Sequence, residues 1–140
     1  MHSLALTGLE GIPEIRAGDD LAALTVDALG RARIALAPGD LLVIAQKIVS
    51  KSEGRSVALA GVTPSPRAIE LAAVTHKDAR LIELVLSESK EVLRAKKDVI
   101  VVEHRLGCVM ANAGIDQSNV EHGGESVLLL PLDPDASCER

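Results

Sequence analysis

Two short segments carry the side chains whose types and spacing could perform chemistry. Lys47 and Lys51 lie four positions apart, directly after a long apolar run, and open α/β sheets place ligands just beyond the ends of their strands. Two ammonium groups there could bind phosphate oxygens. The polar stretch 112–119 combines amide, hydroxyl and carboxylate groups, and Asp116 supplies the hard oxygen that Mg²⁺ or Mn²⁺ prefers. The two segments indicate phosphate and metal chemistry.

Both segments also have a purely structural interpretation. Lysines that leave a strand are commonly solvated, and an asparagine-rich turn uses its side chains to satisfy the local backbone. A catalytic metal needs at least one more protein oxygen besides Asp116, together with substrate phosphates. A third segment, residues 9–15, contains a proline turn before the acidic pair Asp19 and Asp20, and a turn and helix cap explain it. The residue types alone leave these alternatives open.

Composition excludes several other classes of function. The chain has 140 residues, 47% of them hydrophobic, and no Phe, Tyr or Trp, so it cannot build the aromatic platforms of single-strand nucleic-acid binders. A net charge of -5 further disfavours a phosphate-backbone binder. Cys108 and Cys138 lack a CxxC spacing, which predicts neither disulfide nor zinc, and we expect Cys108 to be buried. The four histidines have no ligand spacing.

The N-terminus has neither a basic region nor an apolar stretch long enough for a signal peptide or membrane span, so we expect a cytoplasmic protein without a membrane partner. The length fits one domain, and alternating strand and helix patterns predict a mixed α/β (α+β) fold, with a mixed sheet and flanking helices over residues 1–140. We expect strands at residues 4–9, 41–49, 99–102, 106–110 and 126–130, and helices beginning after Asp20, Ser65 and Asp78.

Several details of these elements can be tested. The first helix should end at Gly30, and the run 41–49 is apolar almost throughout, as in a strand that is buried on both faces. In the second helix the buried side should contain Ile69, Ala72 and Ala73, and in the third helix Glu83 and Glu88 should face solvent.

The C-terminal residues contain a helix-start signal at 133–137, followed by only three residues. A cap without a helix suggests a chain cut at an element boundary, and a frayed polar tail is the alternative.

The motifs occur in an order that resembles the coenzyme F420-0:L-glutamate ligase family over the whole chain. The matching segments are GIPEI (11–15), SKSEGR (50–55), NAGIDQSNV (112–120) and LLPLDPDAS (129–137). The resemblance implies a GTP-dependent amide ligase of F420 biosynthesis that adds L-glutamate to F420-0 through an acyl phosphate, releasing GDP and phosphate. It also implies a homodimer and Mg²⁺ or Mn²⁺, with K⁺ as a further candidate cation.

Site residues follow from the same resemblance. Asp116 would be a metal ligand, and Lys51 and Asp116 would be catalytic, with Lys51 offsetting phosphate charge. The GTP site would be formed by residues of all three polar segments: Ile12, Pro13, Glu14, Ile15, Gln46, Lys47, Lys51 and Asn119.

The chain departs from the family pattern in one respect. Members of the family continue beyond the LDPDAS segment, into an Asp-Thr strand with further metal ligands and a glycine-rich region for GTP, and these 140 residues contain neither. We therefore expect the N-terminal part of a ligase domain, truncated at its C-terminus and inactive alone. The alternative is a non-catalytic, oligomerising α/β nucleotide-binding module of the same fold.

Overall fold

The computed structural model describes residues 3–117 and 126–139. The helices are α1 (Leu21–Ala32), α2 (Gln46–Ser52), α3 (Pro66–Thr75), α4 (Ala79–Ser87) and α5 (Pro134–Cys138), and two short 3-10 turns cover Leu59–Gly61 and Asn112–Gly114. The strands are β1 (Ser56–Ala58), β2 (Ser89–Lys96), β3 (Val99–His104), β4 (Val109–Ala111) and β5 (Ser126–Leu128). The mixed α/β class predicted from the sequence is confirmed.

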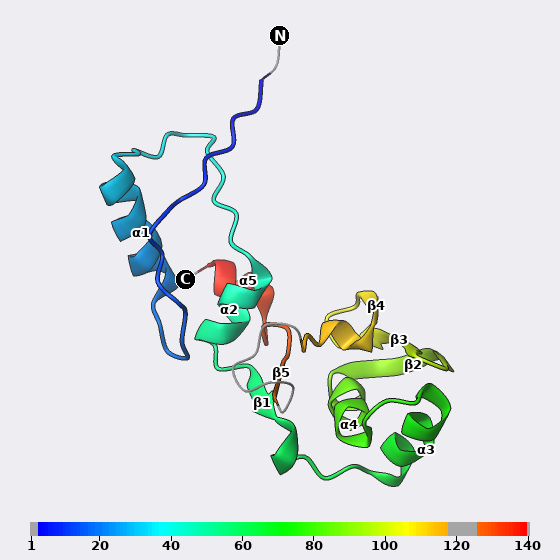
Figure 1. The fold of residues 1–140 in the computed structure, drawn as a ribbon. Coiled ribbons are helices and arrows are strands. Elements are labelled where there is room, and N and C mark those ends of the chain that lie inside the picture. Colours follow the sequence, from blue (N-terminus) through cyan, green and yellow to red (C-terminus); the bar gives the residue numbers. More distant parts are fainter. Residues whose placement is uncertain (1–2, 118–125, 140) are drawn as a thin grey trace.

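The strands form two small sheets (Figure 1). One has the order β2-β3-β4, and the other pairs β1 with β5, so that Ser56 lies opposite Leu128. Every strand pair among the described residues is antiparallel, whereas the sequence predicted a single mixed sheet. The β3–β4 hairpin and the β5 strand occur where they were expected, but β1 and β2 were missed.

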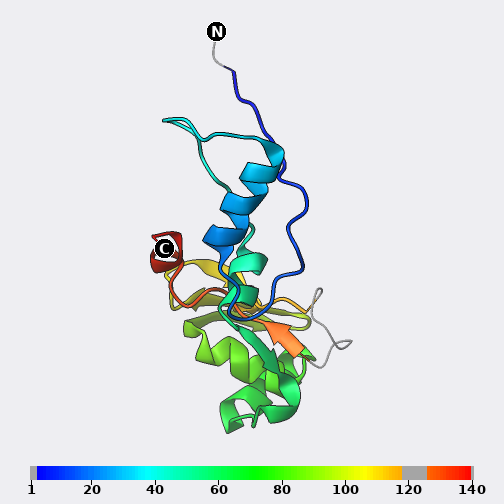
Figure 2. The same cartoon turned by 90° about the vertical axis from the view of Figure 1, so that its left-hand side faces the viewer.

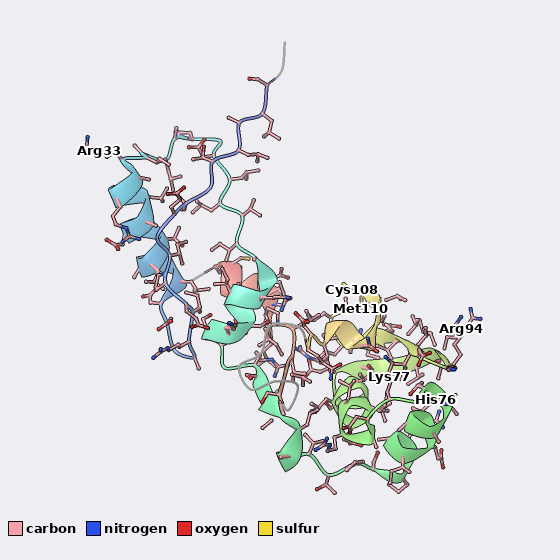
Figure 3. All side chains as sticks on the ribbon, viewed as in Figure 1. Arg33, His76, Lys77, Arg94, Cys108 and Met110 are labelled. Carbon is pink, nitrogen blue, oxygen red and sulfur yellow. The ribbon has the colours of Figure 1, made fainter. Side chains whose placement is uncertain are left out.

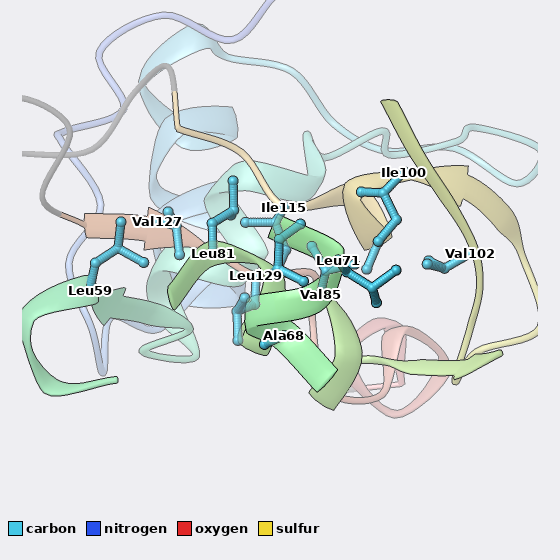
Figure 4. Close-up of a cluster of buried hydrophobic side chains, with 12 residues drawn as sticks. Leu59, Ala68, Leu71, Leu81, Val85, Ile100, Val102, Ile115, Val127 and Leu129 are labelled. Atoms are coloured by element: carbon cyan, nitrogen blue, oxygen red, sulfur yellow. The ribbon is translucent and has the colours of Figure 1, made fainter. Parts of the chain in front are cut away.

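The hydrophobic core lies between the helices α3 and α4 and the β2-β3-β4 sheet (Figure 4). Ile82 and Val85 of α4 are fully buried with Ile100 and Val102 of β3. Val127 joins this cluster from β5, so one core connects the two sheets. Aliphatic side chains therefore fill it without aromatic residues.

Three helices begin at the side chains that the sequence predicted. The Asp20 carboxylate accepts a hydrogen bond from the Ala23 amide, Ser65 accepts one from Ala68, and Asp78 accepts one from Arg80. Each side chain satisfies an amide that has no partner within its own helix. Local cap chemistry therefore fixed the starts of α1, α3 and α4.

The predicted end of α1 was wrong. The helix continues through Gly30 to Ala32, and Arg33 then adopts the left-handed conformation with φ 56°. The Arg33 amide donates hydrogen bonds to the carbonyls of Gly30 and Leu29. A C-cap closed by backbone bonds thus replaces the glycine stop.

The predicted buried face of α3 and the predicted exposure of Glu88 also need correction. Ala68, Leu71 and Thr75 are the buried residues of α3, whereas Ile69 is 56% exposed. Glu88 is only 7% exposed and follows the last turn of α4. The α4 helix itself buries Leu81, Ile82 and Val85 and packs against both α3 and β2. Glu88 is buried because it pairs with Arg55 and Arg105.

The two strands predicted at 4–9 and 41–49 are absent. Residues 3–16 and 41–45 have no regular secondary structure, and α2 begins at Gln46 instead. A strand needs a neighbour to pair with its backbone, and the described residues supply none beside these segments. Gln46, Lys47 and Lys51 are good helix formers, so α2 takes the second half of the predicted strand.

In both orthogonal views, α1 and the connection from Arg33 to α2 extend away from the two sheets (Figure 2). At the other end of the molecule, Cys108 lies with Met110 at the β3–β4 hairpin (Figure 3) and is exposed, so the prediction that Cys108 is buried was wrong.

A short α5 forms after the Asp133 cap, where the sequence suggested a cap without a helix. Within the described ranges, no helix is long and apolar enough to cross a membrane.

Candidate functional site

The α2 helix holds both predicted lysines toward acidic partners from other segments. Lys47 forms an ion pair with the Asp116 carboxylate, and the Lys51 Nζ lies 3.8 Å from Glu14 Oε1. Residues four positions apart share one face of a helix. The fold thus brings Glu14 and Asp116 next to Lys51 and Lys47 of α2. All three polar segments of the sequence therefore meet at this helix.

Asp116 is positioned by its own backbone. Its amide donates to the Leu128 carbonyl at 3.0 Å and its carbonyl accepts from the Leu128 amide at 2.8 Å, so Asp116 extends the edge of β5. The preceding residues Asn112, Ala113 and Gly114 all have positive φ, at 51°, 52° and 68°. Non-glycine residues in this region are strained. The rest of the fold must therefore hold this turn.

Gly114 is required in that turn for a second reason. A Cβ at this position would lie 2.9 Å from Leu130 Cδ1 and from Met110 Sδ. The turn therefore packs against the segment that follows β5, and the side chain of Asn112 is confined with it. The Asn112 Oδ1 is buried and accepts no hydrogen bond from the described residues.

The N-terminal loop contacts the opposite end of α2. The Gly18 amide donates to the Ser52 carbonyl at 2.8 Å, and Gly18 adopts φ +90° there. In this loop Ile15 is buried, whereas Ile12, Pro13 and Glu14 are exposed. The loop thus leaves three of its four predicted nucleotide-site residues accessible beside α2.

One predicted residue, Gln46, makes no contact with the acidic partners of this group. The Gln46 side chain donates to Ser50 Oγ one turn later at 2.5 Å, so in this structure it lies along its own helix. Asn119 lies outside the described residues.

The described residues do not form a complete metal site. Among them, no group of three or more His, Cys, Asp or Glu side chains could hold a metal ion. Asp116 offers one carboxylate, which is ion-paired with Lys47, and Asn112 Oδ1 is a buried oxygen in the same turn. Mg²⁺ takes six oxygens, and proteins commonly supply one or two carboxylates while water and substrate phosphates supply the rest. Asp116 and Asn112 therefore do not complete a site for such an ion by themselves.

A buried ion network that the sequence prediction missed lies next to these segments. The Glu88 carboxylate pairs with Arg55 Nη2 at 2.7 Å and with Arg105 Nε at 3.0 Å. The same guanidinium groups donate to three consecutive carbonyls: Arg55 to Leu130 at 2.8 Å, and Arg105 to Pro131 at 3.0 Å and Leu132 at 2.5 Å. We call Arg55, Glu88 and Arg105 the arginine clamp.

The arginine clamp connects to the α2 segment. The Arg55 carbonyl accepts a hydrogen bond from the Leu129 amide at 3.1 Å, and Glu53 accepts one from the Leu132 amide at 3.1 Å. The chain that leaves α2 is therefore bound directly to the residues after β5. Since β5 also holds Asp116, the clamp helps to keep Asp116 and α2 together.

Electrostatics in the clamp shift two pKa values. Burial raises the pKa of the Glu88 carboxyl, but hydrogen bonds and charges from Arg55 and Arg105 outweigh it and hold that pKa below its usual range. Burial lowers the pKa of His104, against the attraction of the Glu88 charge. The His104 Nδ1 accepts from the Leu106 amide at 3.1 Å, which suits a neutral imidazole. Glu88 is thus charged and His104 neutral at pH 7.

The sequence contained a signal for Glu88. Leu81, Val85 and Glu88 follow the helical spacing of four and three positions, which places all three on one face. A carboxylate in line with two buried residues indicates a buried ion pair. Its partners could not be identified in this way, because Arg55 lies 33 positions away.

A surface depression lies at the C-terminal end of α2. It is lined by Glu53, Gly54, Arg55, Leu132, Asp133 and Ala136. These residues belong to the two motifs SKSEGR and LLPLDPDAS, so the depression adjoins the α2 group but does not contain Lys47 or Asp116.

Comparisons with known proteins agree with this arrangement of motifs. The sequence profile described as F420-0:Gamma-glutamyl ligase matches residues 11–140. The coenzyme F420:L-glutamate ligase of Methanothermobacter thermautotrophicus is 47% identical over 137 residues, covering 98% of this chain and 54% of that protein.

Other relatives have the same name. The ligase of Archaeoglobus fulgidus is 46% identical, covering 94% of this chain and 50% of its own length, and that of Methanopyrus kandleri is 41% identical, covering 100% and 54%. The chain spans about half the length of these curated relatives. With a profile match over nearly all of its residues, the chain belongs to the F420-0:Gamma-glutamyl ligase family.

Proposed function

We propose that this chain supplies the N-terminal part of an enzyme that joins L-glutamate to coenzyme F420-0 at the expense of GTP. The observation that carries the proposal is the convergence on α2, where Lys47 meets Asp116 and Lys51 lies 3.8 Å from Glu14. Three separate polar segments meet at one helix that presents two cations. Such a group suits the binding of a polyphosphate beside a carboxylate substrate.

The proposed chemistry has two steps. A carboxylate oxygen of F420-0 attacks the γ-phosphorus of GTP, so that an acyl phosphate forms and GDP leaves. The glutamate amine then attacks the acyl carbon, the C–N bond forms, phosphate leaves with the C–O electron pair, and the amine gives up a proton. Phosphoryl transfer of this kind depends on positioning and charge compensation. Lys51 would offset phosphate charge in the first step.

Nucleotide contacts of Ile12, Pro13, Glu14, Ile15, Gln46, Lys47, Lys51 and Asn119 remain part of the proposal. Asp116 is proposed as one ligand of Mg²⁺ or Mn²⁺, and K⁺ as a further cation. Because the described residues do not complete a cation site, no step is assigned to the metal. A homodimer and a cytoplasmic location complete the proposal.

The 140-residue chain is proposed to be inactive alone. It spans about half the length of the relatives that carry the ligase name, and its described residues lack a full set of metal ligands.

Calorimetric binding of GTP in the presence of Mn²⁺ tests the nucleotide site. Lys47→Ala and Lys51→Ala should each weaken binding at least tenfold, because each removes a cation from α2. Lys90→Ala is the matched control, since Lys90 forms an exposed ion pair with Glu103 on the other sheet. Equal binding by all variants, or stronger loss in the control, would contradict the assignment of α2.

The full-length Methanothermobacter relative provides the turnover test. The same substitutions at its matching positions should lower kcat/KM for GTP at least tenfold. An unchanged kcat/KM would refute the role of these lysines in the family reaction.

The metal role of Asp116 is tested separately by electron paramagnetic resonance of Mn²⁺. An asparagine at the position matching Asp116 should lower the fraction of Mn²⁺ bound by the full-length relative. An asparagine at the position matching Asp27 is the control and should not, since Asp27 pairs with Arg31 on exposed α1. Equal binding by both variants would remove Asp116 from the metal site.

A further inference from the structure

Residues 41–44 are four consecutive large apolar side chains that the fold leaves uncovered. Leu41 is 88% exposed, Leu42 50%, Val43 90% and Ile44 44%. The exposure alternates with a period of two, as it does along a β-strand whose successive side chains point to opposite faces. We call residues 41–44 the open segment.

The backbone of the open segment lacks hydrogen-bond partners among the described residues. Its residues have no regular secondary structure, and none of their amides or carbonyls forms a hydrogen bond with another residue in the described ranges. The neighbouring bonds stop at either side, with Asp40 to Ala37 before it and Ile48 to Ala45 after it. Unpaired backbone beside exposed apolar side chains is a template for strand pairing.

Other exposed apolar residues belong to the same part of the molecule. Leu36 is 51% exposed on the same connection, and Val26 of the neighbouring α1 is 68% exposed. In Figures 1 and 2 this connection runs from the outer end of α1, near Arg33 in Figure 3, back to α2. An apolar region of this kind marks an interaction surface rather than ordinary solvent-facing chain.

The lengths of the relatives favour one occupant, the part of the ligase outside the match. The matches include nearly all of this chain but only 53–54% of the ligases of Methanothermobacter and Halobacterium. In those proteins the matched region is therefore joined to nearly as much chain again. A second copy is a poorer occupant, because four residues paired with themselves across a twofold axis cover one edge and leave the other edge open.

We propose that residues 41–44 form a β-strand in a sheet completed by strands from the half of the ligase that lies outside the match. The partner is thus an apolar strand that pairs through main-chain hydrogen bonds. The proposal rests on membership of the family and needs neither GTP nor a metal, so it stands or falls separately from the proposed function.

Amide hydrogen exchange of the 140-residue chain is the first test. The amides of residues 42–44 should exchange at the rate of an unstructured peptide at every protein concentration. Protection that rises with concentration would show self-pairing, and protection independent of concentration would show a partner within the chain. Either result would overturn the proposal.

The second test uses the full-length Methanothermobacter relative. The amides that match residues 42–44 should exchange at least 100-fold more slowly there than in this chain. A photo-crosslinking side chain at the position matching Val43 should couple to peptides from the unmatched half, identified by mass spectrometry. Fast exchange, or cross-links only to peptides of the matched half, would overturn the proposal.

A pair of variants checks that the segment acts through pairing. In the relative, a proline at the position matching Val43 should lower the protection of its neighbours at least tenfold, because proline has no amide to donate. In this chain Val43→Pro should leave the circular dichroism spectrum unchanged. A lysine at the position matching Val74, which is exposed on α3, is the control and should leave the protection unchanged. Equal protection in the proline variant and the control would overturn the proposal.

Discussion

The arginine clamp, which joins the chain after α2 to residues 130–132, provides a quantitative test of what stabilises this fold. Glu88→Gln keeps the shape of the side chain and removes its charge. In the native chain Glu88 accepts bonds from Arg55 at 2.7 Å and Arg105 at 3.0 Å. A glutamine amide has one acceptor oxygen, so its NH₂ group must face one of the two guanidinium groups. The variant therefore loses one acceptor and the charge that both arginines share.

The expected loss can be estimated from these contacts. A hydrogen bond to a charged group contributes about 1.5–3 kcal/mol, and removal of one partner from a buried ion pair costs about 3–5 kcal/mol. Arg55 and Arg105 keep partial access to solvent and their bonds to the Leu130–Leu132 carbonyls, which reduces the upper value. We expect Glu88→Gln to lower the free energy of unfolding by about 3 kcal/mol.

Urea unfolding at pH 7 measures this loss, followed by far-ultraviolet circular dichroism because the chain has no aromatic residue. With a slope of about 2 kcal/mol/M, the midpoint should fall by about 1.5 M. Glu70→Gln is the matched control, since Glu70 forms an exposed pair with Arg67, and it should change the free energy by less than about 0.5 kcal/mol. A loss below about 1 kcal/mol for Glu88→Gln would refute the reasoning.

The contribution of Glu88 to the free energy of unfolding depends on pH with a defined sign. The pKa of Glu88 is lower in the folded chain than the usual 4.5 of a glutamate, so its contribution to stability is present above pH 4.5 and is lost as the pH falls through the folded pKa. The difference between native chain and Glu88→Gln should therefore shrink below pH 4.5. A constant difference in acid would contradict a role for the charge.

Three further predictions concern other parts of the structure. The pKa of His104 is lowered from 6.5 in the folded chain. The free energy of unfolding should therefore fall as the pH drops below 6.5, by up to about 1.4 kcal/mol per pH unit. A urea series in which His104→Gln shows the same dependence on pH would contradict this. Gly114→Ala should cost about 1–3 kcal/mol in urea unfolding, whereas Gly8→Ala, with nothing within 4 Å, should be neutral; equal effects would disprove the close packing of this turn. A double-mutant cycle of Lys47→Ala and Asp116→Asn should give a coupling energy of about 0.2–1 kcal/mol, and an additive pair would show that the two side chains do not interact.

Features determined by short stretches of sequence were predictable. Asp20, Ser65 and Asp78 cap their helices because each interacts with amides two or three positions away. The hairpin between β3 and β4 follows from the same local rules, since its strands are separated by a short turn. In each case the partner lies within a few residues and can be found from spacing alone.

Features that depend on a distant partner were not predictable. The run at 41–49 has the composition of a buried strand, but a strand forms only where a neighbour pairs with it, and here its second half became α2. Glu88 was assigned to solvent because its two arginine partners lie 17 and 33 positions away. The candidate site shows the same limit. The motifs identified Lys47 and Asp116, but only the structure shows that they form an ion pair.

The distance along the chain between α2 and the segment after β5 also determines the order in which the protein can form. The contacts of α3, α4, β2, β3 and β4 are mostly local, whereas Arg55 reaches Leu130 across 75 positions. Local contacts form first because they close short loops. During synthesis the α3–β4 region can therefore pack before residues 126–132 leave the ribosome, and Asp116 meets Lys47 only afterwards. The contact between these two polar segments is therefore among the last parts of this chain to form.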